Sequence, residues 1–320
     1  MRVSHIMIIM KRTPIVFRGI DQFFGRNFFA AIHISEETIS GIVFSRVSDR
    51  VELKEHARYF LPVDIMSDPL HVNESMVVGA LKTMKKKIGV KTVAMIVPSP
   101  HFMTGEHLEA REQMSLLYRR LAASAGLSVR SLVYEDTALL KTLSPGDRNN
   151  PTILVRVNPF SSSIYIVEKG KVIKETKSYF SGTGLTNLLH EKCGVGRDEA
   201  HRVKCEEGLR TLGTNRTRDI LLEAAMVLKD DIEQSFISWH QSKSRTNIPG
   251  PSIKKIILLG SESYLYGLAD YLSSALKIEV EHLDVWKNVL DVEASLPTLN
   301  KRDSLDYGEV IGGALYEFIK

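Results

Sequence analysis

The chain has little cysteine, no long apolar run and no surplus of one charge. Its 320 residues include two cysteines, Cys193 and Cys205, which argues against a secreted domain built on disulfides. No segment reaches the roughly 20 apolar residues of a membrane-spanning helix. Basic and acidic residues number 42 and 38, a balance that does not indicate nucleic-acid binding. We therefore expect a cytoplasmic globular protein with no nucleic-acid partner.

The chain also lacks two common phosphate-binding motifs, GxxxxGK[ST] and a GxGxxG after a strand. It has instead two similar segments, Ala30–Phe44 and Ile153–Val167, each an apolar strand, a short polar turn and a second apolar strand. Two such hairpins, each opening one half of a chain, are the layout of a protein that holds a nucleotide's phosphates between two similar domains. Such turns normally use Gly for close backbone approach and Asp for the metal ion, and neither turn has either residue.

The pattern of elements restarts in the middle of the chain. Pro145–Pro151, PGDRNNP, is the strongest linker signal, and after it come a second hairpin, a strand at Lys171–Tyr179 and a helix from Gly184. A composition that is 43% hydrophobic is sufficient for two domains with their own cores. The sequence therefore predicts an α/β protein with a weak structural repeat.

A second nucleotide-like feature is Lys255–Leu276, KIILLGSESYLYGLADYLSSAL. A strand ends at Gly260, a small-residue loop follows, and Gly267 opens an amphipathic helix, which is an arrangement that lets backbone approach a base or sugar. Ser261 replaces the usual second Gly, and Glu262 places a negative charge where phosphates would lie. The alternative reading is a plain strand–loop–helix crossover.

The segment Gly184–Lys204 offers a lysine and a possible metal site. Lys204 lies one turn beyond Glu199 on a predicted helix, where it could lean on a nucleotide or simply face solvent. Two histidines and two cysteines have spacings that could suggest zinc, but their order is unlike common zinc modules: His190, Cys193, His201 and Cys205. We assign no metal site.

Catalytic groups are not identifiable from the sequence. Glu135 and Asp136 follow a predicted strand, and Asp136 is interpreted as the N-cap of a helix at Asp136–Leu143. The alternative interpretation is that a carboxylate of this pair activates a water molecule. No nucleophile and base can be paired from the remaining residues. We assign no catalytic residue.

Several segments, in order, carry a family resemblance: FFGRNFFAAIHISEETISGIVF, EAHRVK, IILLGSESYLYGLADYL and the closing YGEVIGGALYEFIK. From about Phe24 to Lys320 the chain resembles the PilM family, actin-like cytoplasmic proteins of type IV pilus assembly that are similar to the division protein FtsA. The resemblance implies an actin-like (duplicated ribonuclease H-like) two-domain fold with subdomains 1A, 1C, 2A and 2B. The implied bounds are an extension at 1–22, domain 1 at 23–150 with 1C inserted at about 57–127 and a closing helix at 307–320, and domain 2 at 151–306 with 2B inserted at about 185–250.

The resemblance places ATP in a central cleft. The residues expected to line it, as a vestigial site, are Ser35, Glu36, Ser161, Ser162, Lys204, Gly260, Ser261 and Gly267. The metal-side Asp positions of the family are occupied by His33 and Arg156, and Gly positions by Ser35 and Asn158. Losing these groups removes most of the electrostatic stabilisation on which phosphoryl transfer depends. We expect no cofactor or weakly bound ATP, Mg²⁺ only if ATP binds, and little or no hydrolysis.

The resemblance also implies a partner. A groove between 1A and 1C would take the N-terminal cytoplasmic peptide of a PilN-like bitopic membrane protein, which would place the chain at the inner membrane indirectly. Self-association is compatible with this role. The alternatives are an ATP-binding switch or ATPase, in which Arg156 contacts phosphate and serine hydroxyls replace glycine amides, an FtsA-like filament or division protein, and a component of a type II secretion platform.

Overall fold

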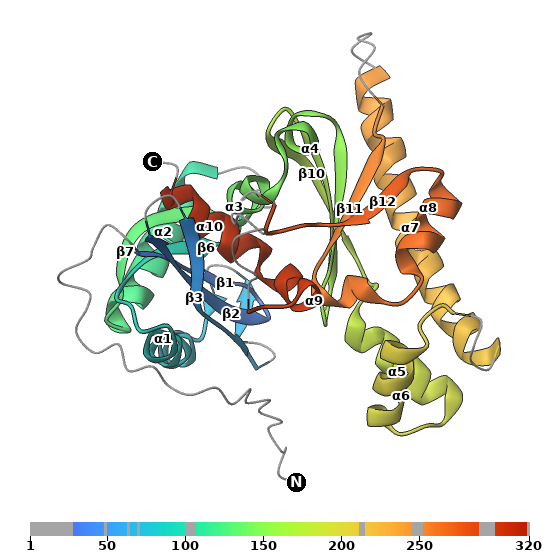
Figure 1. Ribbon diagram of the computed structural model, residues 1–320, viewed down its shortest axis with the longest axis horizontal. Helices are drawn as coiled ribbons and strands as arrows, with labels where there is room; N and C mark the ends of the chain where they lie inside the picture. The colour runs from blue at the N-terminus through green and yellow to red at the C-terminus, as the bar shows by residue number, and fades with distance from the viewer. Residues whose placement is uncertain are drawn as a thin grey trace.

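The computed structural model describes residues 28–47, 50–62, 65–68, 71–99, 107–210, 215–244, 252–287 and 298–318. The expected extension at 1–22 lies outside these ranges. The described chain forms two lobes, each built on a five-stranded sheet (Figure 1).

The two sheets have the same strand order. The first runs β3-β2-β1-β6-β7 and the second β10-β9-β8-β11-β12. In each, the first three strands are antiparallel neighbours and the last two are parallel to the opening strand. The first set of strands is β1 Phe28–Ile34, β2 Thr38–Val47, β3 Arg50–Phe60, β6 Thr92–Val97 and β7 Ser128–Tyr134; the second is β8 Thr152–Val157, β9 Ser162–Glu168, β10 Lys171–Ser178, β11 Lys255–Leu259 and β12 Glu279–His282. The restart predicted from the sequence is therefore a repeat of topology.

Helices cover both faces of the first sheet, and its central strands β1 and β6 are accordingly mostly apolar. One face of β1 packs with α1 (Glu74–Ile88) and α2 (His107–Ser124), and the other with α10 (Gly308–Phe318). The α1 helix begins where the Asn73 side chain accepts a hydrogen bond from the Met76 N–H, and it ends at Gly89 in the left-handed conformation. These local signals define both ends of the helix.

Domain 2 has the same plan with additional helices. Its elements after the hairpin are α5 (Gly182–Cys193), α6 (Arg197–Glu206), the long α7 (Asn215–Ser244) and α8 (Leu268–Leu276). Apolar residues of α5, α7 and α8 pack with β8, β9 and β11 in one core. The short elements α9 (Lys301–Ser304) and η3 (Leu305–Tyr307) then lead into α10.

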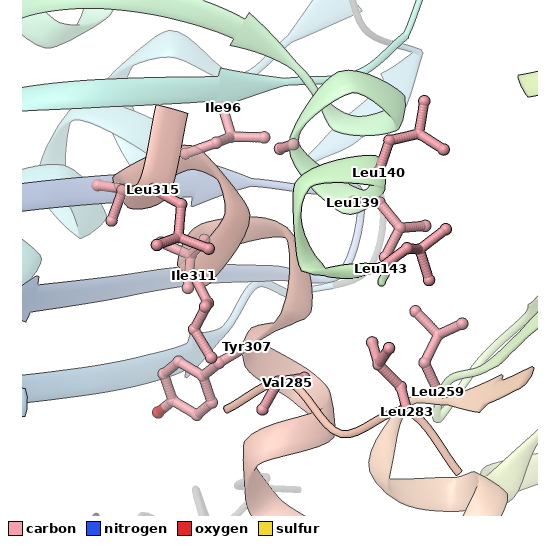
Figure 2. Packing of buried hydrophobic residues seen from close by; sticks show 14 of the residues in the cluster. Ile96, Leu139, Leu140, Leu143, Leu259, Leu283, Val285, Tyr307, Ile311 and Leu315 are labelled. Carbon is pink, nitrogen blue, oxygen red and sulfur yellow. The ribbon is translucent and has the colours of Figure 1, made fainter. Parts of the chain in front are cut away.

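The two lobes share a core. The α3 helix (Glu135–Thr142) and α10 pack against each other, and their apolar residues join residues of both sheets, among them Ile96 of β6 and Leu259 of β11 (Figure 2). A Cβ at Gly312 would overlap the backbone carbonyl of Ala138, so the glycine allows the two helices to come this close. The expected closing helix thus completes the first lobe from the far end of the chain.

The structure differs in detail from three of the expectations drawn from the sequence. Asp136 is not an N-cap: α3 starts one residue earlier, at Glu135, and the Asp136 backbone N–H donates instead to the Ser99 hydroxyl. The Pro145–Pro151 linker contains a short helix, α4 (Pro145–Asn149), because the Ser144 hydroxyl caps it and proline fits a first turn.

The insert expected at about 57–127 includes β6, which lies in the main sheet beside β1. The connection from β3 to α1 carries a small sheet of β4 (Met66–Asp68) and β5 (His71–Val72). The subdomain bounds themselves stay a prediction.

Candidate functional site

The two hairpin turns face each other across the junction of the lobes. The β1–β2 turn contains Ser35, Glu36 and Glu37, and the β8–β9 turn contains Ser161. The Ser161 hydroxyl donates to a Glu37 carboxylate oxygen at 3.1 Å. Burial raises the pKa of Glu37, and the hydrogen bond from Ser161 offsets part of that rise. The turns are therefore joined directly by the chain's own side chains.

The polar groups of the first turn are engaged within it. The Ser35 hydroxyl accepts from the Thr38 N–H at 3.0 Å, and the Ser35 N–H donates to the Thr38 carbonyl at 2.9 Å. Glu36 is exposed. In the second hairpin Ser162 is buried and its hydroxyl donates to the Phe180 carbonyl, away from the first turn. Of the serines predicted for the site, Ser35 and Ser161 lie at the meeting of the turns and Ser162 points elsewhere.

At the ends of the opening strands lie two buried pairs, each of a basic side chain with a glutamate. His33 of β1 donates through Nε2 to a Glu135 carboxylate oxygen at 2.6 Å. Burial by itself would raise the pKa of Glu135, but the hydrogen bond and charge of His33, with the charge of Arg156, lower it to about 2. Arg156 of β8 binds Glu309 of α10 at 2.6 Å, with 11% and 5% of the side chains exposed. This pair joins positions 153 residues apart.

A third pair lies where β3 meets the approach to α10. Arg58 is paired with Asp306, and the other carboxylate oxygen of Asp306 accepts from the Ser261 N–H at 2.8 Å. Burial raises the pKa of Asp306, while Arg58 and the bonds from Ser261 oppose the rise. The backbone donor at Ser261, which was expected to face a nucleotide, is thus used by a carboxylate of the chain.

The loop expected to approach an adenosine is also filled by its own side chains. Gly260 has φ of 84°, and a Cβ there would overlap the carbonyl of Val157, so this loop passes directly over the end of β8. Gly267, with φ of 80°, opens α8 as predicted. Lys204 of α6 is buried and donates to Glu262 at 2.7 Å and to the Gly182 carbonyl at 3.0 Å.

Glu262 occupies the space beside α5. A Cβ at Gly182 would overlap the Glu262 carboxylate, which therefore lies against the α5 backbone. Lys204 lies against Glu262 beside Gly260 and Ser261 of the same loop, whereas Gly267 packs against Leu209. Lys204 was expected either to contact a nucleotide or to face solvent. It is instead buried, and its charge compensates that of Glu262.

The side chains that line the cleft are poorly suited to bind Mg²⁺ and a triphosphate. Guanidinium groups have no lone pair for a metal ion, so Arg156 cannot replace an Asp ligand of Mg²⁺. A charged carboxylate at Glu37 would repel a triphosphate, while Glu262 and Glu309 occupy Lys204 and Arg156, the cations that could otherwise bind one. Within the described residues, no group of three or more His, Cys, Asp and Glu side chains is arranged to hold a metal ion.

Sequence reasoning identified His33 and Arg156 as replacements but missed what they pair with. Glu135 was considered only as a water-activating group, and Glu309 and Asp306 were not considered at all. The signal for Glu309 was present: it is an acidic residue directly before the apolar run VIGGAL in the helix sequence GEVIGGALYEF. A buried charge in such a helix requires a partner.

Two similar sheets joined by α3 and α10, with the hairpin turns of both facing one junction, define an actin-like protein. The comparison with known proteins is consistent with this class and identifies the family. The chain belongs to the family of the type IV pilus assembly protein PilM, whose sequence profile matches residues 124–318. No curated protein sequence matches the chain significantly.

Solved structures with the same fold are distant in sequence. A PilM–PilN type IV pilus biogenesis complex is 15% identical, with a TM-score of 0.67 over 90% of this chain and 98% of that chain. The ethanolamine utilization protein EutJ from Carboxydothermus hydrogenoformans is 18% identical, with a TM-score of 0.54 over 90% and 89%. MreB5 of Spiroplasma citri bound to AMPPNP is 11% identical, with a TM-score of 0.57 over 92% and 97%. At these identities the likeness concerns the fold.

Proposed function

We propose that the protein is a scaffold of a type IV pilus inner-membrane assembly platform and that it binds the N-terminal cytoplasmic peptide of a PilN-like membrane protein. The observation that carries this proposal is membership of the PilM family. The fold shared with a chain from a PilM–PilN complex supports it. No helix in the described part of the chain is long and apolar enough to cross a membrane, so a membrane-anchored partner would supply the attachment.

The peptide site is proposed in domain 1, between the main sheet and the segments inserted within about 57–127. An extended peptide on a preformed groove is a common recognition mode. The proposed bounds of subdomains 1A, 1C, 2A and 2B are those expected from the sequence. Under this proposal the protein is cytoplasmic and peripheral to the inner membrane through its partner.

We further propose that the nucleotide site is degenerate. In an ATP-dependent relative of this fold, metal and phosphates would join the two halves of the cleft. Here Arg156–Glu309, Arg58–Asp306 and Ser161–Glu37 make connections across the same junction. The arginines and carboxylates of these pairs replace the attraction between metal ion and phosphate. The two halves of the cleft are therefore held together without a ligand.

The test combines two titrations of the full chain. Calorimetry with the N-terminal peptide of the PilN-like protein from the same genome is expected to show saturable binding, and a scrambled peptide is expected to show none. The affinity should be unchanged by Mg-ATP. Micromolar Mg-ATP binding coupled to turnover would favour the alternative, an ATP-gated switch, and would remove the degenerate-site proposal. Absence of peptide binding would remove the scaffold proposal, with an FtsA-like filament or a type II secretion component as the remaining readings.

A further inference from the structure

One part of the chain has a strong local charge bias that the balanced total conceals. From Ser75 to Gly105 there are five lysines and no Asp or Glu. These lysines lie between positions 82 and 91, in the last turns of α1 and just before β6. Lys82, Lys86 and Lys91 are exposed.

The fold places further basic residues at the same end of domain 1. The Ser128 N–H donates to the Lys91 carbonyl at 2.8 Å, so β6 and β7 start side by side. The Lys85 ammonium lies beside Gly126, which follows α2. The Arg119 guanidinium reaches the Val129 carbonyl at 3.5 Å. We call this surface the basic end and define it as Lys82, Lys85, Lys86, Lys91, Arg119 and Arg130.

Few acidic groups face the basic end. Lys87, next to it on α1, is paired with Glu55 at 3.3 Å, and Arg120 on α2 is paired with Glu74 at the far end of α1. Within the described residues, no carboxylate lies within ion-pair distance of Lys82, Lys86 or Lys91. Their positive charges are therefore available to a partner.

The basic end is remote from the cleft. Strands β1, β6 and β7 are parallel, and their carboxyl ends lead to the cleft, where His33 meets Glu135. The basic end lies at the opposite edge, where β6 and β7 begin. A partner bound there would not compete with groups in the cleft.

An exposed apolar side chain accompanies the charges. Leu116 of α2 is 64% exposed and lies one turn before Arg119 and Arg120 on the same helix. Long basic side chains can bind the phosphate groups of a lipid surface while the exposed leucine between them contacts the acyl chains below. Exposed aromatic side chains, on which single-stranded nucleic acids stack, do not occur on the described parts of α1 and α2, where Tyr118 is buried.

We propose that the basic end docks on an anionic phospholipid surface, with the lysine and arginine side chains against the headgroup phosphates. Each basic residue near such a surface strengthens binding about fivefold, and the attraction falls off within a Debye length of about 8 Å. The three lysines with no carboxylate partner among the described residues, Lys82, Lys86 and Lys91, give weak, salt-sensitive binding. The proposed peptide tether would raise the effective concentration of the surface and orient domain 1 on it. Docking itself does not depend on the tether.

The test is co-sedimentation of the full chain with phosphatidylglycerol-containing vesicles and with pure phosphatidylcholine vesicles. We expect binding to the anionic vesicles only, and a decrease as salt is raised. The variant Lys82→Gln/Lys86→Gln/Lys91→Gln should lose about a hundredfold in partition coefficient. The matched control is Lys171→Gln/Lys174→Gln/Lys177→Gln on β10, where Glu168 and Glu175 accompany the lysines, and it should bind like the parent.

Three outcomes would overturn the proposal. They are equal binding of the first triple variant and the parent, equal binding to both vesicle types, and charge-dependent binding to DNA in place of vesicles. Circular dichroism checks that each variant is folded. The vesicle assay contains no PilN-like peptide, so loss of vesicle binding and failure of the scaffold proposal are separate results.

Discussion

At the scale of single residues, the cleft is governed by pairs of opposite charge from distant parts of the sequence. A buried ion pair contributes little net stability, because desolvating both charges offsets most of their attraction. Removing one partner is costly, because the other is left buried and uncompensated. Arg156 and Glu309 are both mostly buried, so removing either one alone should be costly.

The Arg156→Met variant should consequently lose about 3–5 kcal/mol in the free energy of unfolding, measured by urea denaturation. The double variant Arg156→Met/Glu309→Leu should recover most of this loss, since neither charge remains. As a control, Lys192→Ala removes one partner of the exposed Lys192–Glu223 pair and should cost no more than about 1 kcal/mol. A single variant no less stable than the double variant would contradict the assigned pairing.

A second residue-scale prediction concerns pH. The pKa of Glu135 is lowered from 4.5 to about 2 in the folded protein, so this group stabilises the fold above the unfolded value and loses that contribution as pH falls. The stability difference between the parent and Glu135→Gln should be about 3 kcal/mol larger at neutral pH than near pH 2.

Urea denaturation from about pH 6 to about pH 3 measures most of this change. The comparison with Glu135→Gln is needed because Glu37 and Asp306 have raised pKa values, which contribute in the opposite direction. Glu223→Gln, at an exposed site, serves as the control. A parent-minus-variant difference independent of pH would contradict the lowered pKa of Glu135.

At the scale of elements, the contact between α3 and α10 depends on a glycine. A Cβ at Gly312 would overlap the Ala138 carbonyl, a backbone atom that cannot move aside as a side chain can. Gly312→Ala should therefore cost about 3 kcal/mol in the free energy of unfolding. Gly79 in α1 is exposed with nothing within 4 Å of its Cβ position, so Gly79→Ala should stabilise by about 0.5–1 kcal/mol. The two variants compared by thermal denaturation test this contrast; equal effects would contradict it.

Elements were the most predictable part of the molecule. Both hairpins, α1 with its caps and the closing helix follow from apolar periodicity and from local signals such as Asn73 and Gly89. The α/β class followed from the order of these elements, whereas the actin-like fold was implied by the family resemblance, and the comparisons confirmed it. The start of α3 was misjudged because Glu135 was assigned to the connection, although its carboxylate is held by His33 and its backbone is already helical.

The pairings within the cleft could not be predicted from one sequence. Arg156 and Glu309 meet because two lobes fold onto each other, and no local pattern contains that information. Lys204 and Glu262 were each noted separately, and only the packing of α6 against the loop after β11 brings them together. The lining residues therefore stay a prediction, although the positions of their side chains are now described.

At the scale of the whole molecule, the two lobes are bound by one continuous apolar cluster that contains Ile96 of the first sheet and Leu259 of the second (Figure 2). Because neither lobe can unfold without exposing part of this cluster, we expect a single cooperative unfolding transition. The chain has two tryptophans: Trp286 lies in the shared cluster and Trp239 in the core of domain 2.

Fluorescence of the variants Trp239→Phe and Trp286→Phe, each with one remaining tryptophan, reports on the two regions separately. For each variant, the urea concentration at the midpoint of unfolding is measured by tryptophan fluorescence and by the helical signal in circular dichroism. The two midpoints should coincide. Midpoints that differ between probes within one variant would show that the lobes unfold independently.

The position of α10 also determines when the protein can fold during synthesis. The helix that covers one face of β1 is made of residues 308–318, which leave the ribosome long after β1. Until α10 has emerged, that face of the first sheet has no cover. Nascent chains of this protein therefore expose an apolar sheet surface until α10 is made, and protection from aggregation must come from chaperones or from delayed collapse of that half.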